Sequence, residues 1–204
     1  NTTAASFGTG APGTIDASKF AGVTEISQSG SSAANIINLE ATTTASLNGT
    51  PVGARSITPA DTAASVTAKG TDVAEGSTLN IGATGTGILN SVSVTGTVAD
   101  TNKDGKLANG NLNITVGKDV ETLSVTVDGG TNLAVANGAG TKTVSTVDAS
   151  ASTGGITYLA APTVSTVKAG AGADTLTIST ATLKDNPATA ADETVSALID
   201  SGAG

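Results

Sequence analysis

Hydrophobic residues in this chain alternate with Ser, Thr and Asn in short runs. The runs 91–98 (SVSVTGTV) and 111–117 (NLNITVG) carry an apolar side chain at every second position. A period of two is typical of a β-strand that buries one face. Segments containing Gly, Pro and Asn separate these runs, as turns separate strands. The pattern therefore predicts an all-β fold made of many short strands.

A regular repeat stands out in the second half of the chain. Val127, Val147 and Val167 are evenly spaced, and the five letters TVSTV end at both Val147 and Val167. A constant period of about 20 residues is typical of stacked units. In a parallel β-solenoid each rung, meaning one winding of the chain, pairs with the next, so that equivalent residues form columns. We expect Val147 and Val167 to stack inside, with Asp148 and Lys168 outside or in the turn; a repeat of sandwich hairpins is the alternative.

The regularity of the pattern changes along the chain and predicts three parts. Residues 1–50 start the solenoid, because TIDAS at 14–18 is close to TVDAS at 146–150. Residues 51–130 alternate more cleanly and are predicted to be an inserted antiparallel β-sandwich. Residues 131–204 continue the solenoid, with about 20 residues per rung and glycine-rich turns.

Composition and charge limit the classes of function that we expect for this chain. Among 204 residues there is no Cys and no His, and 17 acidic against 9 basic residues give a formal charge of −8. Catalytic triads, zinc sites and thiol nucleophiles need the missing residue types, so we expect no enzyme. The acidic balance opposes nucleic-acid binding, and no apolar stretch reaches the ~20 residues of a membrane span. The chain begins at Asn1, which we interpret as a piece of a longer polypeptide.

The turn at 169–174 (AGAGAD) is the first candidate calcium site. Its letters follow the nonapeptide G-G-x-G-x-D-x-U-x, with Ala169 in place of the first glycine and matches at Gly170, Gly172 and Asp174. Glycines bring backbone carbonyls close together, and the aspartate supplies a hard oxygen. Calcium needs six to eight oxygens, so neighbouring turns must share the ion. The alternative is a glycine turn with no ion.

The second candidate calcium site is the segment 100–111 (DTNKDGKLANGN). It begins like an EF-hand loop, with carboxylate and amide oxygens at alternate positions and glycine at the sixth. The ligands in this pattern are Asp100, Asn102, Asp104 and the carbonyl of Lys106. The twelfth position is Asn instead of Glu, so we expect a calcium-binding loop between strands, completed by Asp119 or Glu121. A plain polar turn is the alternative.

The segment 143–180 resembles the repeat region of surface-layer (S-layer) proteins that Gram-negative bacteria export by type I secretion. It pairs a "DAS…TGG" stretch with a "G-x-G-x-D-T-L" turn, and 14–27 (TIDASKFAGVTEIS) looks like another such unit. Adhesins of the RTX type share the motif. The resemblance carries calcium binding over to Gly170, Gly172 and Asp174 only.

This resemblance implies a structural protein that tiles the bacterial surface. We expect an extracellular chain that binds copies of itself in a calcium-dependent lattice, with contacts to cell-surface polysaccharide made by regions outside this chain. A binding module of an RTX-type adhesin is the alternative function.

Overall fold

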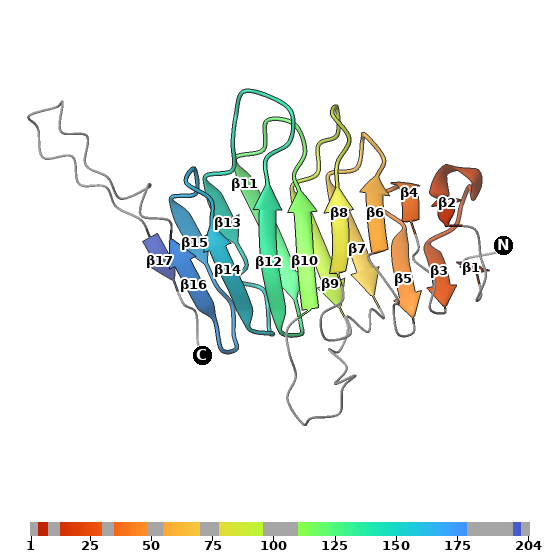
Figure 1. The fold of residues 1–204 in the computed structure, drawn as a ribbon. Helices are drawn as coiled ribbons and strands as arrows, with labels where there is room; N and C mark the ends of the chain where they lie inside the picture. Colours follow the sequence, from red (N-terminus) through yellow and green to blue (C-terminus); the bar gives the residue numbers. More distant parts are fainter. Residues whose placement is uncertain are drawn as a thin grey trace, which may run out of the picture.

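The chain forms a parallel β-solenoid, which confirms the expected fold class. The computed structural model describes residues 4–7, 13–29, 35–48, 55–69, 78–95, 110–178 and 198–200. Every strand pair in this part of the chain is parallel. The strands stand side by side in two layers, and the chain winds from the N-terminal end of the stack to the C-terminal end (Figure 1).

The odd-numbered strands form one sheet, which we call the odd sheet, in the order in which they occur in the chain. They are β1 (Ala4–Phe7), β3 (Glu25–Ser29), β5 (Thr44–Asn48), β7 (Ser65–Lys69), β9 (Ser91–Thr95), β11 (Thr122–Val127), β13 (Thr146–Asp148), β15 (Thr166–Lys168) and β17 (Leu198–Asp200).

The even-numbered strands form the second layer, the even sheet, again in chain order. They are β2 (Thr14–Asp16), β4 (Asn35–Leu39), β6 (Arg55–Pro59), β8 (Thr78–Gly82), β10 (Gly110–Thr115), β12 (Thr131–Ala136), β14 (Ile156–Ala160) and β16 (Thr175–Ile178). One 3-10 turn, η1 (Ala17–Lys19), follows β2. Consecutive strands therefore alternate between the sheets, and each rung contributes one strand to each.

Inward-facing aliphatic residues fill the space between the sheets and stack from rung to rung. One column of the even sheet consists of isoleucines in register, each less than 4% exposed: Ile15, Ile36, Ile57, Ile81 and Ile114. Burying such a side chain contributes about 1.5–3 kcal/mol. The predicted pair Val147 and Val167 is in register on β13 and β15 and buried, as expected. Val127 does not continue this column, because Leu123 of β11 pairs with Val147 and Val127 pairs with Val94.

The only tyrosine of the chain belongs to this core. Tyr158 is 2% exposed and stands in register between Leu133 and Leu176, where the larger ring replaces a leucine. Burial in this apolar column raises the pKa of the Tyr158 hydroxyl. The long polar side chains of Gln28 and Arg55 are also buried, and Arg55 pairs in register with Leu79.

The antiparallel sandwich expected over 51–130 is not confirmed. The described strands in that range, β6 to β11, pair in parallel with each other and with the strands before and after them. Both sheets therefore run through the predicted boundaries at 50 and 130. The clean alternation of this segment reflects one buried face per strand, which a solenoid strand has as well.

The length of a rung varies widely. Val147 pairs with Val167, as the repeat predicts, but Tyr158 pairs with Leu176 after a shorter step, and Val92 pairs with Val125 after a much longer one. The strands keep similar lengths, so the difference lies in the connections between them. These unequal connections hide the repeat in the first half of the sequence.

Candidate functional site: glycine turn and aspartate corners

The predicted calcium turn lies between β15 and β16 and packs tightly on the preceding rung. Gly170 is buried, and a side chain there would overlap the carbonyl oxygen of Ser152. That oxygen accepts a hydrogen bond from the backbone N–H of Ala171 at 2.8 Å. Gly172 has φ = 107°, a conformation that favours glycine, and lies against Gly155. Both glycines are therefore required by close contact between rungs, whether or not an ion is present.

Asp174 joins the same two rungs. Its Oδ1 accepts a hydrogen bond from the backbone N–H of Ile156 at 2.7 Å. Its Oδ2 is shielded from solvent and finds no hydrogen-bond donor among the described residues. This shielded oxygen is the feature of the turn that most resembles a metal ligand, because a carboxylate oxygen without a donor is costly to bury.

The preceding rung does not complete a calcium site around this oxygen. The residue of the preceding rung that Asp174 contacts is Ile156, whose side chain is apolar and buried and offers no second carboxylate. No group of three acidic side chains that could hold a metal occurs in the described part of the chain. Since calcium needs six to eight oxygens, the carboxylates of the described residues do not form a calcium site by themselves.

The second predicted calcium site lies outside the described residues. This applies to all four predicted ligands, Asp100, Asn102, Asp104 and Lys106. Asp119 and Glu121, the two alternatives for completing that site, are described. Asp119 Oδ1 accepts hydrogen bonds from the backbone N–H groups of Thr141 at 2.7 Å and Lys142 at 3.0 Å, and Glu121 Oε2 pairs with Lys142 Nζ at 3.2 Å.

Asp119 exemplifies a feature that the sequence analysis missed: aspartates at the corners of the solenoid bind the following rung. Oδ1 of Asp16 accepts a hydrogen bond from Asn38 Nδ2 at 2.9 Å. Both carboxylate oxygens of Asp61 accept hydrogen bonds, one from the hydroxyl of Thr84 and the other from that of Thr86. These contacts follow strands of the even sheet and lie along one corner.

A short sequence motif explains part of this pattern. In the D-A-S triplets at 16–18 and 148–150, Oδ1 of the aspartate accepts from the backbone N–H of the serine at 3.1 Å in both cases. The serine hydroxyl donates to the same oxygen, at 2.7 Å and 2.6 Å respectively. The similarity of TIDAS and TVDAS is therefore the signal of a local side-chain-to-backbone turn.

Ion pairs add contacts between rungs on the odd sheet. Lys168 Nζ lies 3.0 Å from Asp148 Oδ2 on the neighbouring strand, which places both side chains outside the core as expected. Lys69 on β7 reaches Glu25 on β3 at 2.9 Å, across the intervening strand β5. Exposed pairs of this kind contribute little each.

Hydrogen bonds hold the pKa of four aspartates, three at the corner and Asp148 on β13, below the ordinary value of 3.8. The largest contribution comes from the Asn38 amide at Asp16, the Thr84 hydroxyl at Asp61, the Lys142 backbone N–H at Asp119 and the Ser150 hydroxyl at Asp148. Each hydrogen bond favours the charged form of the acid. The folded chain therefore holds these protons more weakly than the unfolded chain.

This difference predicts that acid destabilises the solenoid. A carboxyl whose pKa is lower in the folded state stabilises the fold fully above the unfolded pKa and loses that contribution as the pH falls through the folded pKa. We expect a thermal midpoint that is nearly constant from pH 8 to about pH 5 and falls below about pH 4. Circular dichroism melts across this range measure it.

A matched variant makes the pH prediction specific. Asp119 has φ = 55°, a conformation that asparagine also adopts. Asp119→Asn keeps an oxygen that accepts from Thr141 and Lys142 but cannot titrate. The variant should fold at pH 7 and lose less stability than the parent on acidification. Equal acid sensitivity of variant and parent would show that Asp119 contributes nothing to it.

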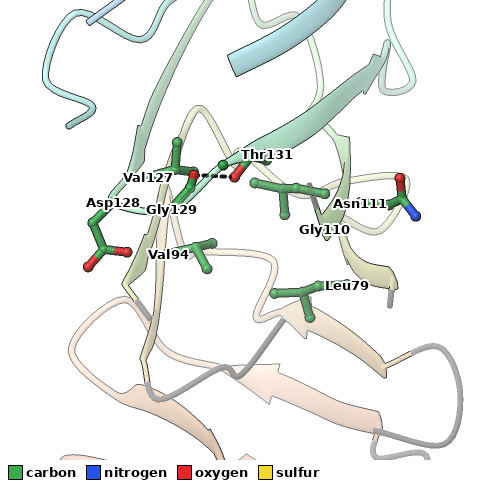
Figure 2. Close-up of a pocket in the computed structure, with 10 residues that line it drawn as sticks. Leu79, Val94, Gly110, Asn111, Val127, Asp128, Gly129 and Thr131 are labelled. Carbon is green, nitrogen blue, oxygen red and sulfur yellow. Dashed lines mark hydrogen bonds between the residues drawn. The ribbon is translucent and has the colours of Figure 1, made fainter. Parts of the chain in front are cut away.

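Two hollows in the described part of the chain are candidates to hold a small molecule. The first lies near the first residues of β8, β10 and β12 and the last residues of β9 and β11 (Figure 2). Its lining includes the apolar side chains of Leu79, Val94, Leu112 and Val127, and the carboxylate of Asp128 points away from the labelled ones, Leu79, Val94 and Val127. Its volume, about 20 Å³, is room for roughly one water molecule. It is far too small for an organic ligand.

The second hollow is open and lies beside η1. Its volume is about 360 Å³, and its lining includes Phe20, Thr42 and one carboxylate, that of Glu40. This size falls within the range of small-ligand sites.

Comparison with known proteins gives no relative. No family model matches the chain, and no curated protein and no solved structure matches it significantly. Within the described ranges, no helix has the length and apolar character needed to cross a membrane.

Proposed function

We propose that this chain is a structural segment of a secreted surface-layer protein that assembles with copies of itself into a calcium-dependent lattice on the bacterial cell surface. The observation that carries the proposal is that the polar side chains at the corners act between rungs. Asp16, Asp61, Asp119 and Asp174 each accept hydrogen bonds from a neighbouring rung. Side chains used in this way serve rigidity, which a lattice segment requires.

The calcium dependence in this proposal rests on Asp174. Its shielded Oδ2 has no donor in the described part of the chain, and the carbonyl-rich glycine turn around Gly170 and Gly172 offers further hard oxygens. The preceding rung offers no carboxylate at that register, so the remaining ligands must come from a following turn. The proposed location on the cell surface, and contacts to polysaccharide through other regions, rest on the resemblance of the segment 143–180.

A calcium titration tests this proposal. An ion that binds only the folded state raises the thermal midpoint as its concentration increases. We expect calcium, and not magnesium at the same concentration, to raise the midpoint and to produce sheets visible by negative-stain electron microscopy.

The matched variant for this test is Asp174→Asn. It retains the oxygen that accepts from Ile156 but loses the negative charge, so the calcium-induced shift should shrink while the calcium-free midpoint changes little. A midpoint insensitive to millimolar calcium in the parent chain, together with no assembly, would contradict the proposal.

The alternative function, a binding module of an adhesin, is favoured by the open hollow beside η1. Its lining combines Phe20, threonines and Glu40, groups suited to a polar ligand such as a sugar. A monomeric chain that binds a glycan array and loses this binding in Glu40→Gln would support the adhesin over the lattice segment.

A further inference from the structure

The outer face of the even sheet is free of charge over most of its length. From β4 to β16, every outward-facing residue in the described strands is Asn, Ser, Thr, Gly or Ala, except Ile37 and Leu159. Arg55 belongs to β6 but faces the core, where it is 3% exposed. The chain as a whole carries a formal charge of −8, so a neutral face of this extent is unusual within it.

The outer face of the odd sheet also consists mainly of Ser and Thr, but it carries charged side chains. They include Glu25, Lys69, Asp148 and Lys168, which form two ion pairs. The acidic corner residues lie along the rim, beyond the ends of the even strands. A neutral centre with a charged rim is the arrangement typical of protein–protein interfaces, whose cores are depleted of charge.

The polar groups of the neutral face already bond to one another. Asn113 Nδ2 donates to Asn80 Oδ1 at 2.8 Å, and Asn132 Nδ2 donates to Asn111 Oδ1 at 3.1 Å. Covering an amide that keeps its hydrogen bond costs much less free energy than covering one that loses its only partner. These ladders therefore lower the cost of removing water from the face.

One large apolar side chain stands on this face. Leu159 on β14 is 67% exposed, and Ala134 on the adjacent strand β12 is exposed as well. Leu159 is one of only two large hydrophobic side chains exposed in the described part of the chain. It provides an apolar anchor in the middle of small side chains.

We propose that the outer face of the even sheet is the surface through which two copies of this chain meet, sheet against sheet, with Leu159 at the contact. Charge favours a second copy as the occupant. Two molecules that each carry a formal charge of −8 repel each other. Contact through the even sheet adds little to this repulsion, because no carboxylate lies at the centre of its outer face. The inference rests on the proposed function, because it names the face that self-assembly uses.

The dimensions of the face predict a weak contact. Seven strands spaced about 4.8 Å apart, each about 17 Å long, give roughly 500 Å² per copy. The total of about 1,000 Å² is at the lower end of specific interfaces. Association through this face alone is therefore reversible and is best measured at high protein concentration.

A pair of double variants tests the face. Ala134→Glu with Leu159→Glu places two negative charges on adjacent strands of the even sheet. Ser93→Glu with Thr126→Glu places the same two charges in register on the odd sheet. Sedimentation velocity, from micromolar to millimolar protein with and without calcium, measures association. Like charges brought together at an interface disfavour association, so the even-sheet variant should raise the concentration of half-association at least about tenfold. The odd-sheet variant should change it less than about threefold.

The possible outcomes distinguish failure of the proposed contact surface from failure of the proposed function. If both double variants associate as strongly as the parent chain, the even sheet is not the contact surface, while self-assembly itself is still supported. A parent chain that stays monomeric under all these conditions overturns both. Because a misfolded variant would also fail to associate, each variant must match the parent in circular dichroism and thermal midpoint. Leu159→Ser, which adds no charge, provides a second test and should weaken association several-fold.

Discussion

Replacing Gly170 with alanine should destabilise the solenoid by about 2–4 kcal/mol and lower its thermal midpoint by roughly 5–15 °C. The added methyl group would overlap the carbonyl oxygen of Ser152 in the preceding rung. The same oxygen accepts the hydrogen bond from the backbone N–H of Ala171, so moving it away weakens that bond too. Urea and thermal unfolding followed by circular dichroism measure the loss.

The effect should be large because Ser152 is itself fixed. It is 2% exposed, its hydroxyl accepts from the backbone N–H of Val127 at 3.1 Å and donates to the carbonyl of Val125 at 3.3 Å. Any movement that makes room at Gly170 therefore disturbs β11 as well. Overpacking is most costly where the neighbours cannot move.

Gly85→Ala is the matched control. No heavy atom lies within 4 Å of the position that its methyl group would occupy, and its backbone does not require glycine. This variant should stay within about 0.5 kcal/mol of the parent. Equal stability of the two variants in the absence of calcium would show that packing does not require glycine at position 170. Metal binding would then be the remaining reason for a glycine there.

The glycine turn shows what the sequence could and could not predict about the candidate site. The spacing of Gly170, Gly172 and Asp174 correctly indicated a special turn. It did not indicate that the neighbouring rung places Ser152 and Ile156 against these residues. That contact depends on the stacking register, which the sequence does not display because the step from one rung to the next changes within this turn.

The core was more predictable than the topology. A buried valine column follows from the constant step of the repeat, and Val147 and Val167 fulfil it. Over 51–130, period-two alternation reports a strand with one buried face but does not distinguish a parallel from an antiparallel partner. The much longer step from Val92 to Val125 then concealed that these strands are neighbours in the same parallel sheet.

The contacts of the corner aspartates could not be predicted from the sequence for a similar reason. Asp61 contacts Thr86, 25 positions later, and Asp119 contacts Thr141, 22 positions later. Such separations follow from the lengths of the individual connections and form no constant period. Only the local D-A-S turns could be recognised in the sequence, because residues 14–18 (TIDAS) are similar to residues 146–150 (TVDAS).

Truncating Leu123 to alanine should destabilise the fold by about 2–5 kcal/mol, because a buried leucine leaves a cavity that a rigid core fills poorly. Leu123 is fully buried on β11 and stacks in register on Val147. The same truncation at Leu159, which is 67% exposed, removes little contact and should change stability by less than about 0.5 kcal/mol. Urea unfolding of both variants measures the difference. A large loss at Leu159 in a monomeric sample would place that side chain inside the fold and would remove the anchor of the proposed contact between copies.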